Sequence, residues 1–197
     1  MESKIYKYLR PAADLFFRMI FRYRFYGVEN VPKDGAAILC ANHLSMWDPF
    51  AVVFALKRLP CFIAKKEIFK NKLFASICTD LKAFPVDRGR MDMKAIKNAL
   101  KVLKDGELLG IFAQGTRVKE GEDVAAKAGV ALFAVKSGAP VIPVAIKANY
   151  KLFSRVDVYF GEPINFEHMK GAKVSTEELN EIAEGIMAKV FDMLEDK

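Results

Sequence analysis

Short apolar runs alternate along this chain with segments of helical character, and this alternation restricts the possible fold more than any other feature of the sequence. Each apolar run is long enough for one buried strand, and such runs occupy residues 36–41, 61–64, 82–86, 108–113, 141–146 and 156–160. The helical segments lie between and after them, at residues 49–56, 91–104, 124–136 and 176–194. Strands that alternate with helices are typical of an α/β fold, so we predict a central mixed sheet flanked by helices.

The length and composition fit one compact domain. The chain has 197 residues, of which 52% are hydrophobic and 28% are charged, and it contains no internal repeat or Ser/Gly linker. We therefore predict a single α/β domain over residues 27–197, preceded by a helical segment over residues 1–26. The cysteines, Cys40, Cys61 and Cys78, lie in apolar contexts, which favours buried thiols in a reducing compartment over disulfide bonds.

The chain is both basic and apolar, with a formal net charge of +7 and a mean hydropathy of +0.10. This combination indicates an anionic membrane surface as a partner. The longest uncharged run, Gly35 to Trp47, is shorter than the ~20 residues that a transmembrane helix needs. The first residues also lack the continuous apolar region of a secretory signal. We expect a peripheral protein on the cytoplasmic face of a membrane, without a transmembrane span.

The N-terminal segment has the pattern of a helix that lies in the plane of a membrane surface. Its charged residues recur every three or four positions and would form one narrow stripe, at Lys7, Arg10, Asp14, Arg18 and Arg22. Aromatic and aliphatic side chains fill the rest of the helix surface, as they do in interfacial helices. The alternative is a helix that packs on the domain and leaves its charged stripe in water.

The loop after the first buried strand, at residues 42–49, is the first candidate for chemistry, because loops at strand ends carry many functional side chains of α/β folds. His43 is a candidate general base. The carboxylate of Asp48 could fix its tautomer if the chain bends between them, as Pro49 suggests. The alternatives are that Asp48 caps a helix and that His43 is an ordinary loop histidine. A metal site is poorly supported, because Cys40, His43 and Asp48 would mix ligand types without a fourth candidate nearby.

Two further segments place an arginine beside a glycine at the end of a predicted strand. In the first, Gly115 lets the backbone approach a ligand, Thr116 supplies a hydroxyl, and Arg117 can bind a phosphate or carboxylate through two hydrogen bonds. The second delivers Arg88 next to a glycine. Both segments indicate a site for an anionic group.

Four blocks therefore follow one another along the chain: Asn42 and His43 with Asp48 at the spacing N-H-x-x-x-x-D, the pair Asp87 and Arg88, the run Gln114 to Arg117, and the run Val141 to Val144. In this order they resemble the blocks of the glycerolipid acyltransferase family, and in particular those of 1-acyl-sn-glycerol-3-phosphate acyltransferases, over about residues 25 to 163. The resemblance implies a membrane-surface enzyme of phospholipid biosynthesis. Such an enzyme moves a fatty acyl group from acyl-CoA or acyl carrier protein to the free hydroxyl of 1-acyl-glycerol-3-phosphate and gives phosphatidic acid.

The resemblance also implies roles for individual residues. His43 would be the general base that removes the proton of the acceptor hydroxyl, and Asp48 would orient it. Substrate binding would fall to Arg88 and to the third block, Gln114, Gly115, Thr116 and Arg117. Of these, Arg88 and Arg117, with Gly115 and Thr116, would hold the acceptor phosphate. The acyl thioester is a co-substrate, and no separate cofactor is expected. The N-terminal helical segment would dock on the membrane.

The third block departs from the usual family sequence Pro-Glu-Gly-Thr-Arg, because Ala113 and Gln114 stand at its first two positions. Glutamine keeps the shape and hydrogen-bonding capacity of glutamate but not its charge. This departure leaves two alternatives open, another lysolipid acceptor and a non-catalytic lipid-binding protein. Nucleic-acid binding rests on basicity alone, without a recognised module, and is not expected. A covalent mechanism through Cys40 is disfavoured, because this cysteine is predicted to face the core.

Overall fold

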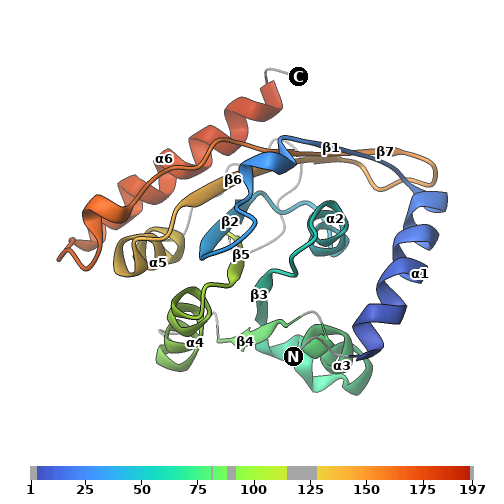
Figure 1. Ribbon diagram of the computed structural model, residues 1–197, viewed down its shortest axis with the longest axis horizontal. Helices are drawn as coiled ribbons and strands as arrows, with labels where there is room; N and C mark the ends of the chain where they lie inside the picture. The colour runs from blue at the N-terminus through green and yellow to red at the C-terminus, as the bar shows by residue number, and fades with distance from the viewer. Residues whose placement is uncertain (1–3, 81, 88–91, 115–127, 196–197) are drawn as a thin grey trace.

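The computed structural model describes residues 4–80, 82–87, 92–114 and 128–195. Within these residues, seven strands form one sheet in the spatial order β1-β7-β6-β2-β5-β3-β4 (Figure 1). The strands are β1 (Arg22–Tyr26), β2 (Ala37–Ala41), β3 (Cys61–Lys65), β4 (Phe84–Val86), β5 (Leu108–Phe112), β6 (Val141–Ala148) and β7 (Arg155–Phe160).

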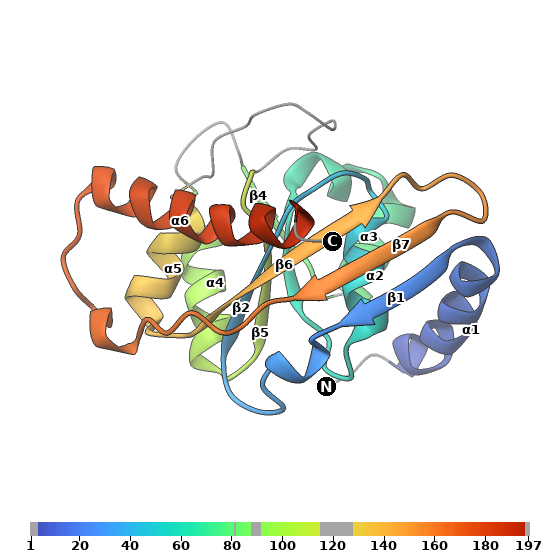
Figure 2. The same cartoon turned by 90° about the horizontal axis from the view of Figure 1, so that it is seen from above.

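The sheet is mixed, and its parallel part determines where polar loops can meet. β2 pairs in parallel with β5 and with β6, and β3 pairs in parallel with β5 and with β4. β7 is antiparallel to β6, and β1 pairs with β7 in parallel at the edge of the sheet (Figure 2). The carboxyl ends of β2, β3, β4, β5 and β6 therefore share one edge of the sheet, which is where open α/β sheets bind their ligands.

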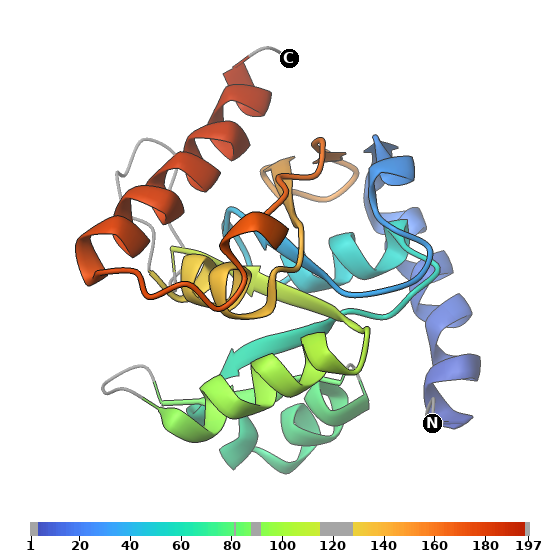
Figure 3. The same ribbon diagram turned by 60° about the vertical axis from the view of Figure 1, so that its left-hand side comes forward.

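Helices cover both faces of the sheet. Those in the described residues are α1 (Lys4–Ile20), α2 (Asp48–Ala55), α3 (Lys72–Asp80), α4 (Met93–Lys104), α5 (Gly129–Ser137) and α6 (Thr176–Glu195). α1 and α2 pack on one face, whereas α4, α5 and α6 pack on the other, so α1 and α6 lie on opposite sides of the molecule (Figure 3). None of these helices is long and apolar enough to cross a membrane.

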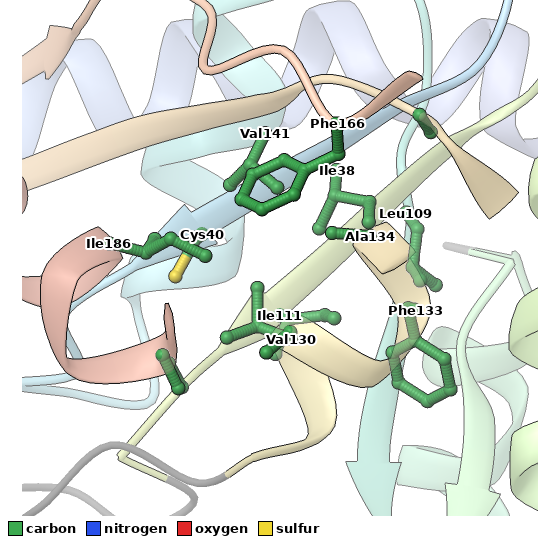
Figure 4. Packing of buried hydrophobic residues seen from close by; sticks show 14 of the residues in the cluster. Ile38, Cys40, Leu109, Ile111, Val130, Phe133, Ala134, Val141, Phe166 and Ile186 are labelled. Carbon is green, nitrogen blue, oxygen red and sulfur yellow. The ribbon is translucent and has the colours of Figure 1, made fainter. Parts of the chain in front are cut away.

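The central strand β2 contributes to the hydrophobic core on both faces of the sheet, because all five of its residues are buried. Leu39 faces the core beneath α1 and α2. Ile38 and Cys40 face the other core, where they pack with side chains of β5, α5 and α6 such as Ile186 (Figure 4). A strand that is buried on both faces gives a continuous apolar run in the sequence, and this is why the run at 36–41 predicted it correctly.

The predicted fold class is confirmed, since a mixed sheet flanked by helices is observed. Each predicted strand is present within a few residues of its expected position. The predicted helices are present as α2, α4, α5 and α6. α5 begins at Gly129, and residues 124–127 of the helix predicted at 124–136 lie outside the described residues. α3 was not predicted.

The N-terminal segment differs from the helical segment predicted over residues 1–26. α1 ends at Ile20, and residues 22–26 form β1 at the edge of the sheet. The step of four from Arg18 to Arg22 continues a helical spacing. In the structure, however, Arg22 and Arg24 are exposed while Tyr23 is half-buried, which is the period of two of a strand. Residues 22–26 are therefore part of the sheet, and the helical segment is shorter than expected.

Candidate active site

The candidate site begins where β2 ends, and a hydrogen-bonded asparagine fixes that end. The side-chain amide of Asn42 donates to the carbonyl oxygen of Ile146 at 2.9 Å, and its Oδ1 accepts from the N–H of Ile146 at 2.7 Å. Both bonds are buried and connect the loop to β6. The next backbone N–H, that of His43, donates to Oε1 of Gln114 at 3.1 Å. The loop is thus attached on both sides to the ends of neighbouring strands.

His43 and Asp48 are in direct contact, as the predicted bend between them requires. Nδ1 of His43 lies 2.8 Å from Oδ2 of Asp48. Oδ2 also accepts two backbone N–H groups, so it carries no proton, and Nδ1 must be the donor in this bond. The other ring nitrogen, Nε2, then has the lone pair. The arrangement presents a base at the carboxyl end of β2 and an acceptor-only carboxylate behind it.

The carboxylate of Asp48 is fully buried and accepts hydrogen bonds on both oxygens. The N–H groups of Leu44 and Ser45 donate to Oδ2 at 2.7 and 2.8 Å, and the hydroxyl of Tyr150 donates to Oδ1 at 2.6 Å. These donors compensate for the loss of hydration that burial of a charge requires. Asp48 is the first residue of α2, but its side chain turns back toward the preceding loop and does not cap the helix.

Tyr150 contacts Asp48 in the candidate site, and the sequence did not predict this contact. It follows β6 and lies 102 positions from Asp48. Burial, the negative charge of Asp48 and the hydrogen bond all raise the pKa of the Tyr150 hydroxyl far above its usual range, in that order of size. The phenol therefore remains a neutral donor to Asp48. Only the fold brings the two residues together, so no local pattern could have revealed the pair.

Aromatic rings surround the histidine and the loop that carries it. The imidazole of His43 stacks on Phe112, with ring centroids 4.2 Å apart, and Phe112 stacks on Phe62 at 5.8 Å. On the other side, Phe17 of α1 packs against Trp47 at 5.3 Å. The His43 side chain is only 13% exposed. The ring is therefore held in one plane and sheltered from bulk water.

Of the predicted substrate-binding residues, only Gln114 lies within the described residues. It is buried, and its Oε1 is the acceptor for the N–H of His43. A glutamate at this position could accept the same hydrogen bond, so the departure from the family sequence keeps this contact. Arg88, Gly115, Thr116 and Arg117 lie outside the described residues.

Cys40 faces away from this site. Its side chain is buried in the core on the opposite face of the sheet from Leu39, with its sulfur 3.9 Å from the sulfur of Met187 on α6. Burial raises the pKa of the Cys40 thiol to about 12, so it remains protonated and is a poor nucleophile. In the described part of the chain, no three His, Cys, Asp or Glu side chains are grouped as metal ligands would be.

Comparisons with known proteins show the family of this chain. A family model described as Acyltransferase matches residues 22–147. The chain is 31% identical to the 1-acyl-sn-glycerol-3-phosphate acyltransferase of Bacillus subtilis, over 90% of this chain and 94% of that protein. It is 32% identical to the enzyme of the same name from Streptococcus pneumoniae, over 100% of this chain and 75% of that protein.

A solved structure extends the similarity to the fold. The crystal structure of the 1-acyl-sn-glycerophosphate acyltransferase PlsC from Thermotoga maritima matches with a TM-score of 0.73 and 26% identity, over 100% of this chain and 85% of that chain. The matched family model, which covers both His43 and Asp48, and the shared fold define an acyltransferase. The chain belongs to the family of 1-acyl-sn-glycerol-3-phosphate acyltransferases.

Proposed function

We propose that this enzyme transfers a fatty acyl group from acyl-CoA or acyl carrier protein to the free hydroxyl of 1-acyl-glycerol-3-phosphate, giving phosphatidic acid. The observation that carries the proposal is the pair of His43 and a fully buried, fully hydrogen-bonded Asp48. Nε2 of His43 accepts the proton of the acceptor hydroxyl while the oxygen attacks the thioester carbonyl. The tetrahedral intermediate then expels the thiolate, which takes the proton back from His43, so no acyl-enzyme forms.

Asp48 has two functions in this scheme. Its hydrogen bond fixes the tautomer of His43 that has its lone pair on Nε2, and its charge stabilises the imidazolium that forms during the reaction. General base catalysis of this kind contributes about 10²- to 10⁴-fold to a rate. A carboxylate held by Leu44, Ser45 and Tyr150 needs little rearrangement as the imidazolium forms.

The acceptor phosphate is assigned to Arg88 and Arg117, with Gly115 and Thr116 beside them. Guanidinium groups suit phosphate because they can donate two parallel hydrogen bonds. Gln114 belongs to the same proposed pocket, and its contact with the N–H of His43 keeps that block next to the base. A phosphate held at a fixed distance from His43 would orient the acceptor hydroxyl, and such orientation lowers the barrier by several kcal/mol. No cofactor enters the scheme.

The lysolipid acceptor is an amphiphile, so we place the reaction at an anionic membrane surface, on its cytoplasmic face. Support comes from α1, where Leu15, Phe16 and Met19 are exposed apolar side chains, and from the exposed Arg22 that follows it. The exposed Arg18 of α1 is paired with Asp14. Exposed apolar side chains next to basic ones are typical of helices that bind anionic lipid surfaces.

The test of the reaction is thioester consumption by the purified protein. Acyl-CoA and acyl carrier protein donors are compared, each with and without lysophosphatidic acid in vesicles. Turnover should require the acceptor and should be lost in His43→Ala. The control is His168→Ala, which removes the other histidine of the chain from an exposed position and should retain full turnover. Equal turnover in His43→Ala and the unmodified enzyme would remove His43 as the base.

Gln114 gives a specific reason to test a second acceptor class. Family members usually have glutamate at this position, and the neutral amide changes the charge next to the base. Lysolipids with and without a phosphomonoester, offered with the same donor, separate the two possibilities. An enzyme specific for 1-acyl-glycerol-3-phosphate should lose most of its turnover with acceptors that lack the phosphomonoester, whereas turnover with those acceptors would favour another lysolipid.

A further inference from the structure

The turn between β6 and β7, residues 149–154, has two exposed apolar side chains at its tip. Leu152 is 67% exposed and Phe153 is 61% exposed, which are among the highest values for large apolar side chains in the described residues. Isolated exposed apolar residues are common on protein surfaces, but two adjacent ones at the tip of a turn are less easily explained by packing. Neither side chain belongs to the hydrophobic core of the domain.

The backbone of this turn is also unusual. Phe153 has φ +61° and Tyr150 has φ +49°, in the left-handed region that bulky side chains rarely adopt. Hydrogen bonds hold the turn in this conformation: the N–H of Phe153 donates to the carbonyl of Ile20 at 2.7 Å, and that of Ser154 donates to the carbonyl of Lys151 at 2.9 Å. Strained residues persist where the surrounding structure enforces them, and they concentrate at functional sites.

The hydrogen bond to Ile20 places the tip beside the end of α1, whose exposed apolar residues are Leu15, Phe16 and Met19. Figure 2 shows the β6–β7 turn and α1 at the same end of the molecule. Exposed basic residues accompany both elements, at Arg22 and Lys151, and at Arg18, which is paired with Asp14. Apolar side chains with cations around them match the two parts of an anionic lipid surface, its acyl chains and its headgroups.

We propose that Leu152 and Phe153 insert into the anionic lipid surface beside α1 and form a second, independent membrane contact of this enzyme. The inference rests on the membrane location in the proposed function, and adds to it the residues that make the contact. It also connects the membrane to the site, because the same turn carries Tyr150, which donates to Asp48. If the tip of the turn is inserted in lipid, the carboxyl edge of the sheet, which carries His43 and Asp48, would face the membrane surface that supplies the lysolipid acceptor.

The test is Phe153→Asn, because asparagine tolerates the left-handed backbone but has no apolar side chain. Binding is measured by co-sedimentation with vesicles of equal parts phosphatidylcholine and phosphatidylglycerol. The variant should bind these vesicles about tenfold more weakly, as expected when one buried phenylalanine is lost. Its Tm should not fall, because the substitution removes a strained, exposed side chain. The matched control is Phe191→Asn, which changes an exposed phenylalanine of α6 on the opposite side of the molecule and should leave binding unchanged.

Leu152→Asn repeats the test at a position without positive φ, so the proposal can still be judged if Phe153→Asn proves unstable. If both variants bind like the unmodified enzyme, the tip does not insert, while binding through α1 remains. If the unmodified enzyme does not bind anionic vesicles at all, the membrane location in the proposed function fails together with this inference. If the enzyme is a dimer and Phe153→Asn makes it monomeric, the tip contacts a second copy of the chain, and the lipid contact is wrong.

Discussion

At the scale of single residues, the site depends on how completely Asp48 is surrounded by hydrogen-bond donors. Two backbone N–H groups hold it through the local loop, and His43 and Tyr150 hold it through their side chains. Substitutions other than proline leave the two backbone donors in place. The hydroxyl of Tyr150 can be removed by substitution with phenylalanine, and it acts on His43 only through Asp48, so Tyr150 is a positioning residue.

Tyr150→Phe should lower kcat about tenfold and change the pH dependence of kcat, while KM changes little. The variant leaves Oδ1 of the buried Asp48 without this donor, and loss of a hydrogen bond to a buried charged group costs about 1 to 3 kcal/mol of stability. The control is Tyr23→Phe, because the buried hydroxyl of Tyr23 has no hydrogen-bond partner in the described structure. Tyr23→Phe should keep full activity and equal or higher stability. An unchanged pH profile in Tyr150→Phe would show that the hydroxyl serves packing alone.

The same two phenols predict loss of stability in alkaline solution. Their ordinary pKa is 10.0, and burial raises the pKa of both in the folded state. Below pH 10.0 both phenols are protonated in the folded and in the unfolded chain, so the free energy of unfolding does not depend on their titration. Above it, the unfolded chain releases protons that the folded chain keeps, so the free energy of unfolding falls by up to about 1.4 kcal/mol per pH unit for each phenol. Urea unfolding is measured below and above pH 10.0. The free energy of unfolding should fall less steeply with pH in the double variant Tyr23→Phe/Tyr150→Phe than in the unmodified enzyme, and equal slopes would contradict this prediction.

At the scale of elements, the sequence predicted best what is determined locally. The run at 36–41 predicted β2 because burial on both faces leaves only apolar residues, and Pro49 indicated the start of α2 near Asp48. β1 was missed because its arginines continue the spacing of the helix before it, and its pairing with β7 is a contact across most of the chain. The Tyr150 contact depends on tertiary structure in the same way, so neither could be predicted from one segment.

A glycine of β5 connects the packing of strands to the site. A Cβ added at Gly110 would lie 2.4 Å from the ring of Phe62, which stacks on Phe112, and Phe112 in turn stacks on His43. Gly110→Ala should therefore cost about 1 to 3 kcal/mol of stability, as overpacked cores do, and should also lower kcat. The measurements are urea unfolding and thioester turnover.

The matched control for Gly110 is Gly185 in α6, where an added Cβ meets nothing within 4 Å. Gly185→Ala should raise the free energy of unfolding by about 0.5 to 1 kcal/mol, because alanine favours a helix interior over glycine, and should leave kcat unchanged. If both variants had the same stability, the close approach of β5 to Phe62 would not explain why residue 110 is a glycine.

At the scale of the whole molecule, α1 has two faces with different roles, and the structure separates them at adjacent residues. Phe17 is buried and packs against Trp47, Phe50 and Phe54, so it joins α1 to the helix that begins at Asp48. Phe16 is 54% exposed on the surface that we assign to lipid. The buried face belongs to the α/β domain, whereas the exposed face does not contribute to its core.

Alanine substitution at these two positions should therefore give opposite results. Phe17→Ala should lower the free energy of unfolding by about 3 to 5 kcal/mol, as loss of a buried phenylalanine does, and should reduce turnover because Trp47 precedes Asp48. Phe16→Ala should leave the free energy of unfolding within about 0.5 kcal/mol, as most surface substitutions do, and should weaken binding to anionic vesicles. Urea unfolding and vesicle co-sedimentation of both variants check this. Equal losses of stability would mean that α1 packs through both faces, and its contact with lipid would then require another surface.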